Sequence, residues 1–340
     1  MMIKKIFVLL AGFTFAVGLT EATLHVLPVS TGYRSQPIND LRPVLQGKPG
    51  FLSTYSKGWN FRLVQQHKLN NFGYPSKEAF QAGIHPVLVI GDSFIQAAAI
   101  KEEDHIASHL AKSLGVPIYP LGQAGASLSE YIGILEWAVK NFSPQAVVIA
   151  IQEGDISGSV NGEVHHFECS QLECSIHRTD SVEKNRIVQT INSSKLFRYL
   201  FDNLKFVDNL KFVANLNPAI GINSALNKED TQLNGRMVDF FLDEVERIIG
   251  KENVVFTVDT PSSNNHTDEL NLFESRAELK GFNVVNIAGS FSKWRDMGVR
   301  LNFKPVDGHW NEKAHQIAAE EVLPSVKRVF AYSHGLDKPA

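Results

Sequence analysis

Two short segments carry residue types that can perform nucleophilic chemistry. Ser93 ends the triplet Gly91-Asp92-Ser93, which follows an apolar run, so its hydroxyl is expected at the carboxyl edge of a sheet. Far along the chain, Asp307 stands two residues before His309. An aspartate so placed can hold the imidazole Nδ1 and leave Nε2 facing a serine, which then attacks an acyl carbon. Taken alone, Gly-Asp-Ser is also typical of an ordinary turn.

The elements that must position these residues follow a βα alternation. Short apolar runs predict strands, and stretches with helical spacing predict helices between them. The predicted strands are 85–90, 116–120, 146–151, 253–258 and 283–287, and the predicted helices are 102–114, 127–141, 237–249, 268–280 and 313–329. This order predicts an α/β fold with a five-stranded, doubly wound parallel sheet. The turns that hold Ser93 and His309 then lie at the same carboxyl edge.

The segments resemble those of the SGNH (GDSL-type) hydrolase superfamily, over about residues 85–156 and 250–330. Gly91-Asp92-Ser93-Phe94 is similar to the first block of that family, and Pro120-Leu121-Gly122-Gln123-Ala124-Gly125 to its N-x-G-x-x-G block. Upstream, Leu69–Tyr74 is similar to the N-x-x-G-Y/F-R lead-in of anchored bacterial members. Asp307-Gly308-His309-Trp310 resembles the D-x-H-W block of polysaccharide O-acetyltransferase relatives such as the alginate acetylation proteins.

The resemblance implies a three-layer α/β/α, flavodoxin-like fold and a role for each matching residue. Ser93 would be the nucleophile, His309 the general base and Asp307 the group that orients His309. The backbone amides of Ser93 and Gly125 would hold the oxyanion.

One block departs from the family pattern. The third block of the family ends in Gly-x-Asn-Asp, and its asparagine side chain donates to the oxyanion. Here the strand at 146–151 continues into Gln152-Glu153-Gly154-Asp155, so Gly154 stands at the position of the usual asparagine. Losing one oxyanion donor can cost roughly 100- to 1,000-fold in rate. Gln152 is a candidate substitute donor; the backbone amides alone, or weak activity, are the alternatives.

The N-terminus has the layout of an export signal. Two lysines precede an uncharged apolar run at residues 6–19, and apolar residues continue to Leu27. The segment approaches the roughly 20 residues that a membrane span needs. We therefore favour an uncleaved signal-anchor over residues 1–27 in the inner membrane, which places the rest of the chain in the bacterial periplasm. A cleaved signal peptide, and a buried core helix, are the alternatives.

The two cysteines of the chain, Cys169 and Cys174, lie close together in sequence. In an oxidising compartment this spacing predicts a local disulfide. Histidines at 165, 166 and 177 surround the pair, which keeps a zinc site open as an alternative, and two free or unrelated thiols are the other alternative. The spacing matches no standard zinc finger, so no metal is expected.

The predicted domain organisation has a linker and an insertion. Residues 28–60 are rich in Pro, Gly, Ser and Tyr, and the segment 28–84 is interpreted as a linker or strap. The hydrolase-like domain covers 85–332 and is interrupted by an insertion at 157–232. The insertion contains a near-repeat, DNLKFV at 202–207 and again at 208–213. An amphipathic helix that covers part of the sheet is the favoured interpretation, and a surface for a membrane or a partner is the alternative.

The expected function is that of an exported serine esterase. It would remove O-acyl groups, with an O-acetylated carbohydrate as the substrate class and no cofactor. One alternative is an O-acetyltransferase that works with envelope polysaccharide machinery. The other is a weakly catalytic glycan-binding or scaffold protein, which Gly154 favours. The net charge of −3, without a Lys/Arg-rich stripe, argues against a nucleic-acid partner.

Overall fold

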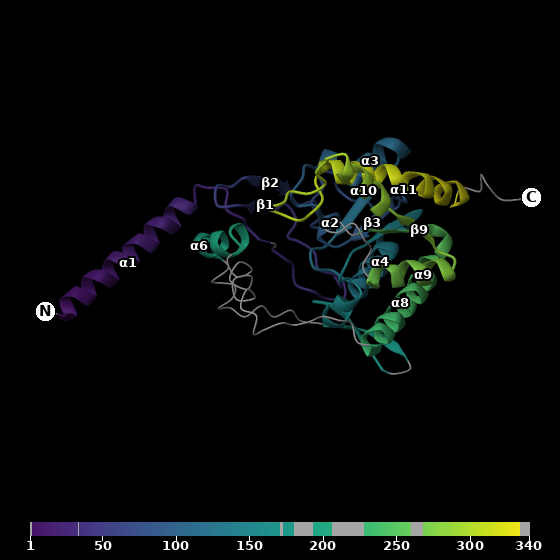
Figure 1. Ribbon diagram of the computed structural model, residues 1–340, viewed down its shortest axis with the longest axis horizontal. Helices are drawn as coiled ribbons and strands as arrows, with labels where there is room; N and C mark the ends of the chain where they lie inside the picture. Colours follow the sequence, from purple (N-terminus) through teal and green to yellow (C-terminus); the bar gives the residue numbers. More distant parts are fainter. Residues whose placement is uncertain are drawn as a thin grey trace, which may run out of the picture. The chain divides into compact units, whose positions relative to one another are not determined.

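The computed structural model describes residues 2–32, 34–170, 173–179, 193–205, 228–259 and 268–333 (Figure 1). The chain divides into two units, each of which is described by itself. The smaller unit takes residues from Met1–Tyr33, Leu52–His67 and Glu183–Ser224. The larger unit takes residues from Arg34–Phe51, Lys68–Val182 and Ala225–Ala340.

The larger unit is built on a five-stranded parallel sheet in the order β4-β3-β5-β8-β9. The strands are β3 (Val87–Gly91), β4 (Ile118–Gly122), β5 (Ala146–Ile151), β8 (Val254–Val258) and β9 (Asn283–Asn286). This is the flavodoxin-like order, in which ligands bind outside the carboxyl ends of the strands. The prediction of a doubly wound α/β fold with five parallel strands is confirmed.

Alternate residues of the strands point into two apolar layers. Leu88 and Ile90 of β3 belong to one buried cluster, and Val87 and Val89 belong to the other. The first layer is covered by α4 (Leu128–Phe142), α8 (Lys228–Ile249) and α9 (Asp268–Leu279). The second is covered by α3 (Ile106–Leu114), α10 (Ala288–Asp296) and α11 (Glu312–Ser333) (Figure 1). Because both faces are covered, the strands read as continuous apolar runs.

Some elements differ from the prediction. The second strand was expected at 116–120, but β4 runs on to Gly122 with Pro120 inside it. Pro120 is tolerated because β4 is an edge strand, where a missing N–H breaks no ladder on the outer side. Helix α8 begins nine residues before the predicted start, at Lys228. Helix α10 was not predicted, nor were the short helices η2 (Ser157–Asn161) and η4 (Lys251–Asn253). The helix predicted at 102–114 is divided into η1 (Glu102–Asp104) and α3, and the chain after Asp92 forms the short helix α2 (Ser93–Gln96).

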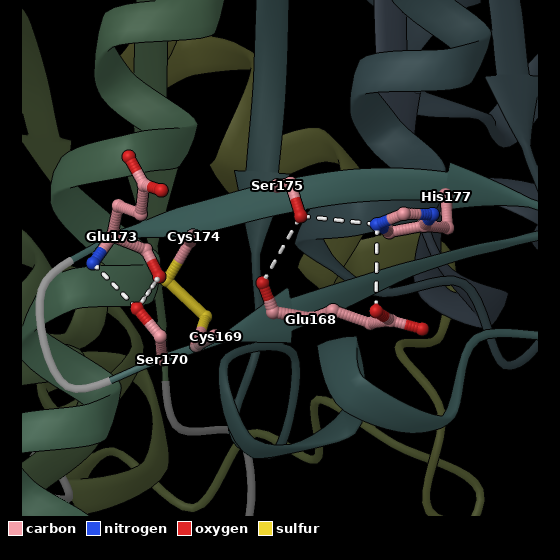
Figure 2. Close-up of a disulfide and its surroundings, with 7 residues drawn as sticks. All are labelled: Glu168, Cys169, Ser170, Glu173, Cys174, Ser175 and His177. Carbon is pink, nitrogen blue, oxygen red and sulfur yellow. Dashed lines mark hydrogen bonds and ion pairs between the residues drawn. A yellow bond between two sulfur atoms is a disulfide. The ribbon is translucent and has the colours of Figure 1, made fainter.

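A disulfide-closed hairpin follows β5 in the larger unit. Strands β6 (His165–Cys169) and β7 (Cys174–Arg178) pair antiparallel, and Cys169 is bonded to Cys174. Figure 2 shows this bond at the turn, with Glu168, Ser175 and His177 further along the hairpin. The structure thus joins the two sulfurs to each other, at the pair for which the sequence predicts a disulfide. Among the described residues, no group of three or more His, Cys, Asp or Glu is arranged to hold a metal ion.

The smaller unit contains the N-terminal helix α1 (Met2–Leu24) and a two-stranded sheet of β1 (Leu52–Lys57) and β2 (Leu63–Lys68). These strands fall inside the segment predicted as a linker. A short helical segment, α6 (Lys195–Arg198) and η3 (Tyr199–Asn203), completes the unit. Within the described residues, one helix is long and apolar enough to cross a membrane, Ile3–Leu24. The second DNLKFV copy lies outside the described residues.

Candidate active site

Ser93 is the first residue of α2 and follows a tight turn after β3, at the carboxyl edge of the sheet. The Asp92 carboxylate accepts a hydrogen bond from the Phe94 amide at 2.9 Å and so caps this short helix. The helix packs closely on the end of the neighbouring strand: a Cβ at Gly122 would lie 2.0 Å from the Gln96 amide nitrogen. Glycine is therefore required there for the turn to hold the Ser93 hydroxyl at this edge.

The Ser93 hydroxyl lies within hydrogen-bond distance of an imidazole from the far end of the chain. His309 Nε2 is 2.8 Å from Ser93 Oγ, and His309 Nδ1 is 2.5 Å from Asp307 Oδ1. Asp307 is buried, and the same oxygen accepts the His309 backbone amide at 2.8 Å. A carboxylate on Nδ1 favours the tautomer whose Nε2 accepts the serine proton. The structure thus brings together the three residues predicted as nucleophile, base and orienting acid.

Trp310 anchors the turn that carries His309. Its indole Nε1 donates to Asp259 Oδ2 at 3.2 Å, directly after β8, and the residue is almost completely buried. Its ring packs against Phe94 and Phe291, and Phe94 also contacts the His309 ring. Trp310, the tryptophan of the D-x-H-W block, therefore helps to hold the His309 imidazole against the helix that starts with Ser93.

Two carboxyl groups lie close to the Ser93 turn, the half-buried Asp92 and the buried Asp155. Burial raises the pKa of Asp92 to about 6, although the Phe94 amide and His309 act in the opposite direction. Burial also raises the pKa of Asp155 well above its usual range, and the nearby charge of Asp92 raises it further. Asp155 accepts hydrogen bonds from the Tyr131 hydroxyl and the Gln152 amide. The loop after β5 is thereby tied to α4 below the candidate nucleophile.

The raised pKa of Asp92 predicts a pH-dependent stability. Folding favours the protonated form, so this contribution is fully present below the unfolded pKa of 3.8 and is lost as the pH rises through about 6. Asp92→Asn keeps a capping side chain but does not ionise. In urea unfolding at pH 4 to 8, we expect the free energy of unfolding of the variant to gain on wild type as the pH rises, by up to about 3 kcal/mol. Parallel pH curves would contradict the assignment.

The predicted oxyanion positions lie in the loops that follow β4 and β5. Gly125 stands three residues after β4, and Gly154 three residues after β5 with φ +90°, the left-handed region that favours glycine. Strands β3 and β5 are neighbours in register, so the Gly154 loop and Ser93 share one sheet edge. Gln152 is buried, and its side-chain oxygen makes no hydrogen bond among the described residues.

The backbone N–H of Gly154 already donates a hydrogen bond to another residue. It donates to the Glu269 Oε2 atom at 3.0 Å, from the first turn of α9. A carboxylate is the group that most closely mimics an oxyanion, and its charge opposes a second anion nearby. Glu269 was predicted only as part of a helix, because no local sequence signal points to a partner 115 residues away. Asp259 was also missed as a site residue. In its case a local signal was present, because an aspartate directly after a buried strand stands at the carboxyl edge of the sheet.

Three of the segments that resemble SGNH blocks, residues 91–94, 120–125 and 307–310, lie at the same edge of the sheet. No family model matches the chain, and no curated protein matches it. Solved structures are similar at low identity. LAE5, an alpha/beta hydrolase enzyme from the metagenome of Lake Arreo in Spain, is 14% identical with a TM-score of 0.40, covering 74% of this chain and 98% of that chain.

Two further solved structures are similar to the same extent. A catalytic mutant of Axe2, an acetylxylan esterase from Geobacillus stearothermophilus, is 13% identical with a TM-score of 0.39, covering 73% of this chain and 95% of its own. The lipase/acylhydrolase from Enterococcus faecalis is 12% identical with a TM-score of 0.38, covering 75% and 98%.

Proposed function

We propose that this chain is a serine ester hydrolase of the SGNH type that acts on an O-acyl ester. The observation that carries the proposal is the 2.8 Å contact of Ser93 Oγ with His309 Nε2, while Asp307 holds the opposite ring nitrogen. A serine hydroxyl is a weak nucleophile until a base in this position accepts its proton.

In the proposed mechanism, Ser93 Oγ attacks the acyl carbon while its proton moves to His309 Nε2. Asp307 stabilises the imidazolium, and the amides of Ser93 and Gly125 donate to the oxyanion. His309 returns the proton to the leaving alcohol, which leaves an acyl-serine. Water then loses a proton to His309 and attacks the acyl carbon. The bond from that carbon to Ser93 Oγ breaks, His309 gives the proton to Oγ, and the acid leaves.

The substrate class follows from one block and the location from two features. Asp307-x-His309-Trp310 resembles the block of polysaccharide O-acetyltransferase relatives, so we propose an O-acetyl group on a carbohydrate as the substrate. The apolar helix α1 and the Cys169–Cys174 disulfide support an exported, membrane-anchored protein, because disulfides persist in oxidising compartments.

A serine-directed fluorophosphonate tests the proposal on the full-length protein. We expect one label on Ser93 of the folded protein, located by peptide mass spectrometry, and none after denaturation, because only the folded chain supplies His309. The Ser113→Ala variant, which removes an exposed hydroxyl on α3, is expected to label normally. Folded protein that stays unlabelled at Ser93 would contradict the mechanism and favour a glycan-binding role. Acetate release from acetylated glycans, measured with and without an added acceptor glycan, then separates hydrolysis from transfer.

A further inference from the structure

Two large apolar side chains of the smaller unit are strongly exposed. Val26 is 83% exposed, two residues after the end of α1, and Trp59 is 73% exposed in the turn between β1 and β2. Leu27 and Phe201 are exposed to a smaller extent. We call these four residues the juxtamembrane face. An exposed apolar surface next to a helix that can span a membrane is a candidate for contact with lipid or with a protein partner.

The segment that carries Phe201 is attached to the last turn of α1. The Glu21 carboxylate accepts hydrogen bonds from the amides of Lys195 and Leu196, both at 2.7 Å, and from the Ser194 hydroxyl at 2.9 Å. It therefore satisfies the free N–H groups at the start of α6, which lies beside this end of α1 (Figure 1). A residue of the apolar helix thus holds a segment more than 170 residues away in sequence.

The same segment is attached to the β1–β2 hairpin. The buried Asn203 side chain accepts from the Ser30 amide at 3.2 Å and donates to the Ser56 hydroxyl at 2.7 Å. The Tyr199 hydroxyl donates to the Trp59 carbonyl oxygen at 2.6 Å. Trp59 and Phe201 are therefore held in a fixed relation to the end of α1.

The length of α1 sets the depth of this face. Its 23 residues extend about 35 Å, against a hydrocarbon core of about 30 Å. Glu21 lies one turn before the helix end, so a spanning α1 brings the start of α6 to the level where hydrocarbon gives way to headgroups. Tryptophan and tyrosine concentrate at that level, because their rings are apolar and their N–H or O–H groups remain hydrated.

We propose that the juxtamembrane face lies in the headgroup region of the membrane that α1 spans, with Trp59 and Phe201 inserted at the boundary with the acyl chains. The partner is the lipid surface itself. The inference goes beyond the proposed hydrolase and rests on α1 as a retained anchor. According to this proposal, the segment 195–203 contacts the membrane. This was the alternative interpretation of the insertion in the sequence.

Tryptophan quenching by brominated phosphatidylcholine tests this contact in the full-length protein reconstituted into vesicles. The difference in emission between wild type and Trp59→Phe isolates Trp59 from the other three tryptophans. We expect bromines near the headgroups to reduce the Trp59 emission about twofold or more, as for an indole 5–10 Å inside the interface. Trp294→Phe, a half-buried tryptophan of the larger unit, is the matched control and should leave the quenched component in place.

The Glu21→Ala variant provides a second test of the same proposal. It removes the acceptor for α6, so quenching of Trp59 should fall while the protein still floats with the vesicles through α1. Thr20→Ala, one residue earlier on the helix, should retain full quenching. Flotation without quenching of Trp59 in wild type overturns the lipid contact alone. Failure to float overturns both the anchor and the contact, and neither result bears on labelling of Ser93.

Discussion

Replacing Ser93 or His309 by alanine is expected to lower kcat for an aryl acetate by roughly 10⁴- to 10⁶-fold. Ser93 Oγ and His309 Nε2 share one proton at 2.8 Å, so the loss of either partner ends the transfer that activates the nucleophile. Initial rates of aryl acetate hydrolysis, at matched amounts of folded protein, measure the effect.

The double variant makes this expectation sharper. Because the two residues act as a unit, Ser93→Ala combined with His309→Ala should be hardly slower than either single variant. His85→Ala replaces an exposed imidazole of the same unit that bonds a backbone carbonyl, and it should hydrolyse at the wild-type rate. Losses that multiply in the double variant would show that the residues act independently, and the proposed mechanism would be wrong.

Supplying the missing donor is expected to have the largest effect in the opposite direction. Gly154→Asn places a side-chain amide where the SGNH pattern has one, and a Cβ there meets nothing within 4 Å. A restored oxyanion donor is worth up to about 100- to 1,000-fold in kcat. The φ of +90° opposes any side chain, at a cost in stability on the order of 1 kcal/mol. Kinetics and urea unfolding, measured on the same preparations, separate the two effects.

Three matched variants show where the gain comes from. Gly154→Ala carries the backbone strain without a donor, so it should lose stability and gain no rate. Glu269→Gln removes the charge beside the Gly154 amide and should raise kcat, whereas Glu274→Gln, later on the same helix, should not. A rate lost in Gln152→Ala, with none gained in Gly154→Asn, would instead assign the donor to Gln152. If none of these variants changes the rate, the oxyanion assignment in this loop is wrong.

The sheet could be predicted because its strands are buried on both faces. The runs around Val147 and Val255 are continuously apolar, and such runs between helical stretches have few interpretations other than a parallel sheet. Helix α10, Ala288–Asp296, has glycine, serine and charged residues and buries only Phe291, so no apolar period marked it. The β1–β2 hairpin was missed because its burial alternates weakly and its partners come from distant segments.

The candidate site could be predicted where chemistry is local in sequence. Asp307 and His309 are two residues apart, and Cys169 and Cys174 can meet across one turn, so the spacing itself limits the geometry. The contact of Glu269 with Gly154, and that of Trp310 with Asp259, join segments that meet only after the sheet is assembled. Backbone hydrogen bonds such as that of the Gly154 amide leave no compositional trace.

Ser93 and His309 are 216 positions apart in sequence, which bears on when the candidate site can form. Ser93 follows the first strand of the sheet, β3, and His309 stands shortly before the final helix, α11. A chain whose synthesis has not reached residue 309 holds the hydroxyl but lacks the imidazole, so the proposed relay cannot form until the last part of the chain is made. Under the proposed mechanism, ester turnover would therefore begin only after this C-terminal segment has joined the rest of the fold.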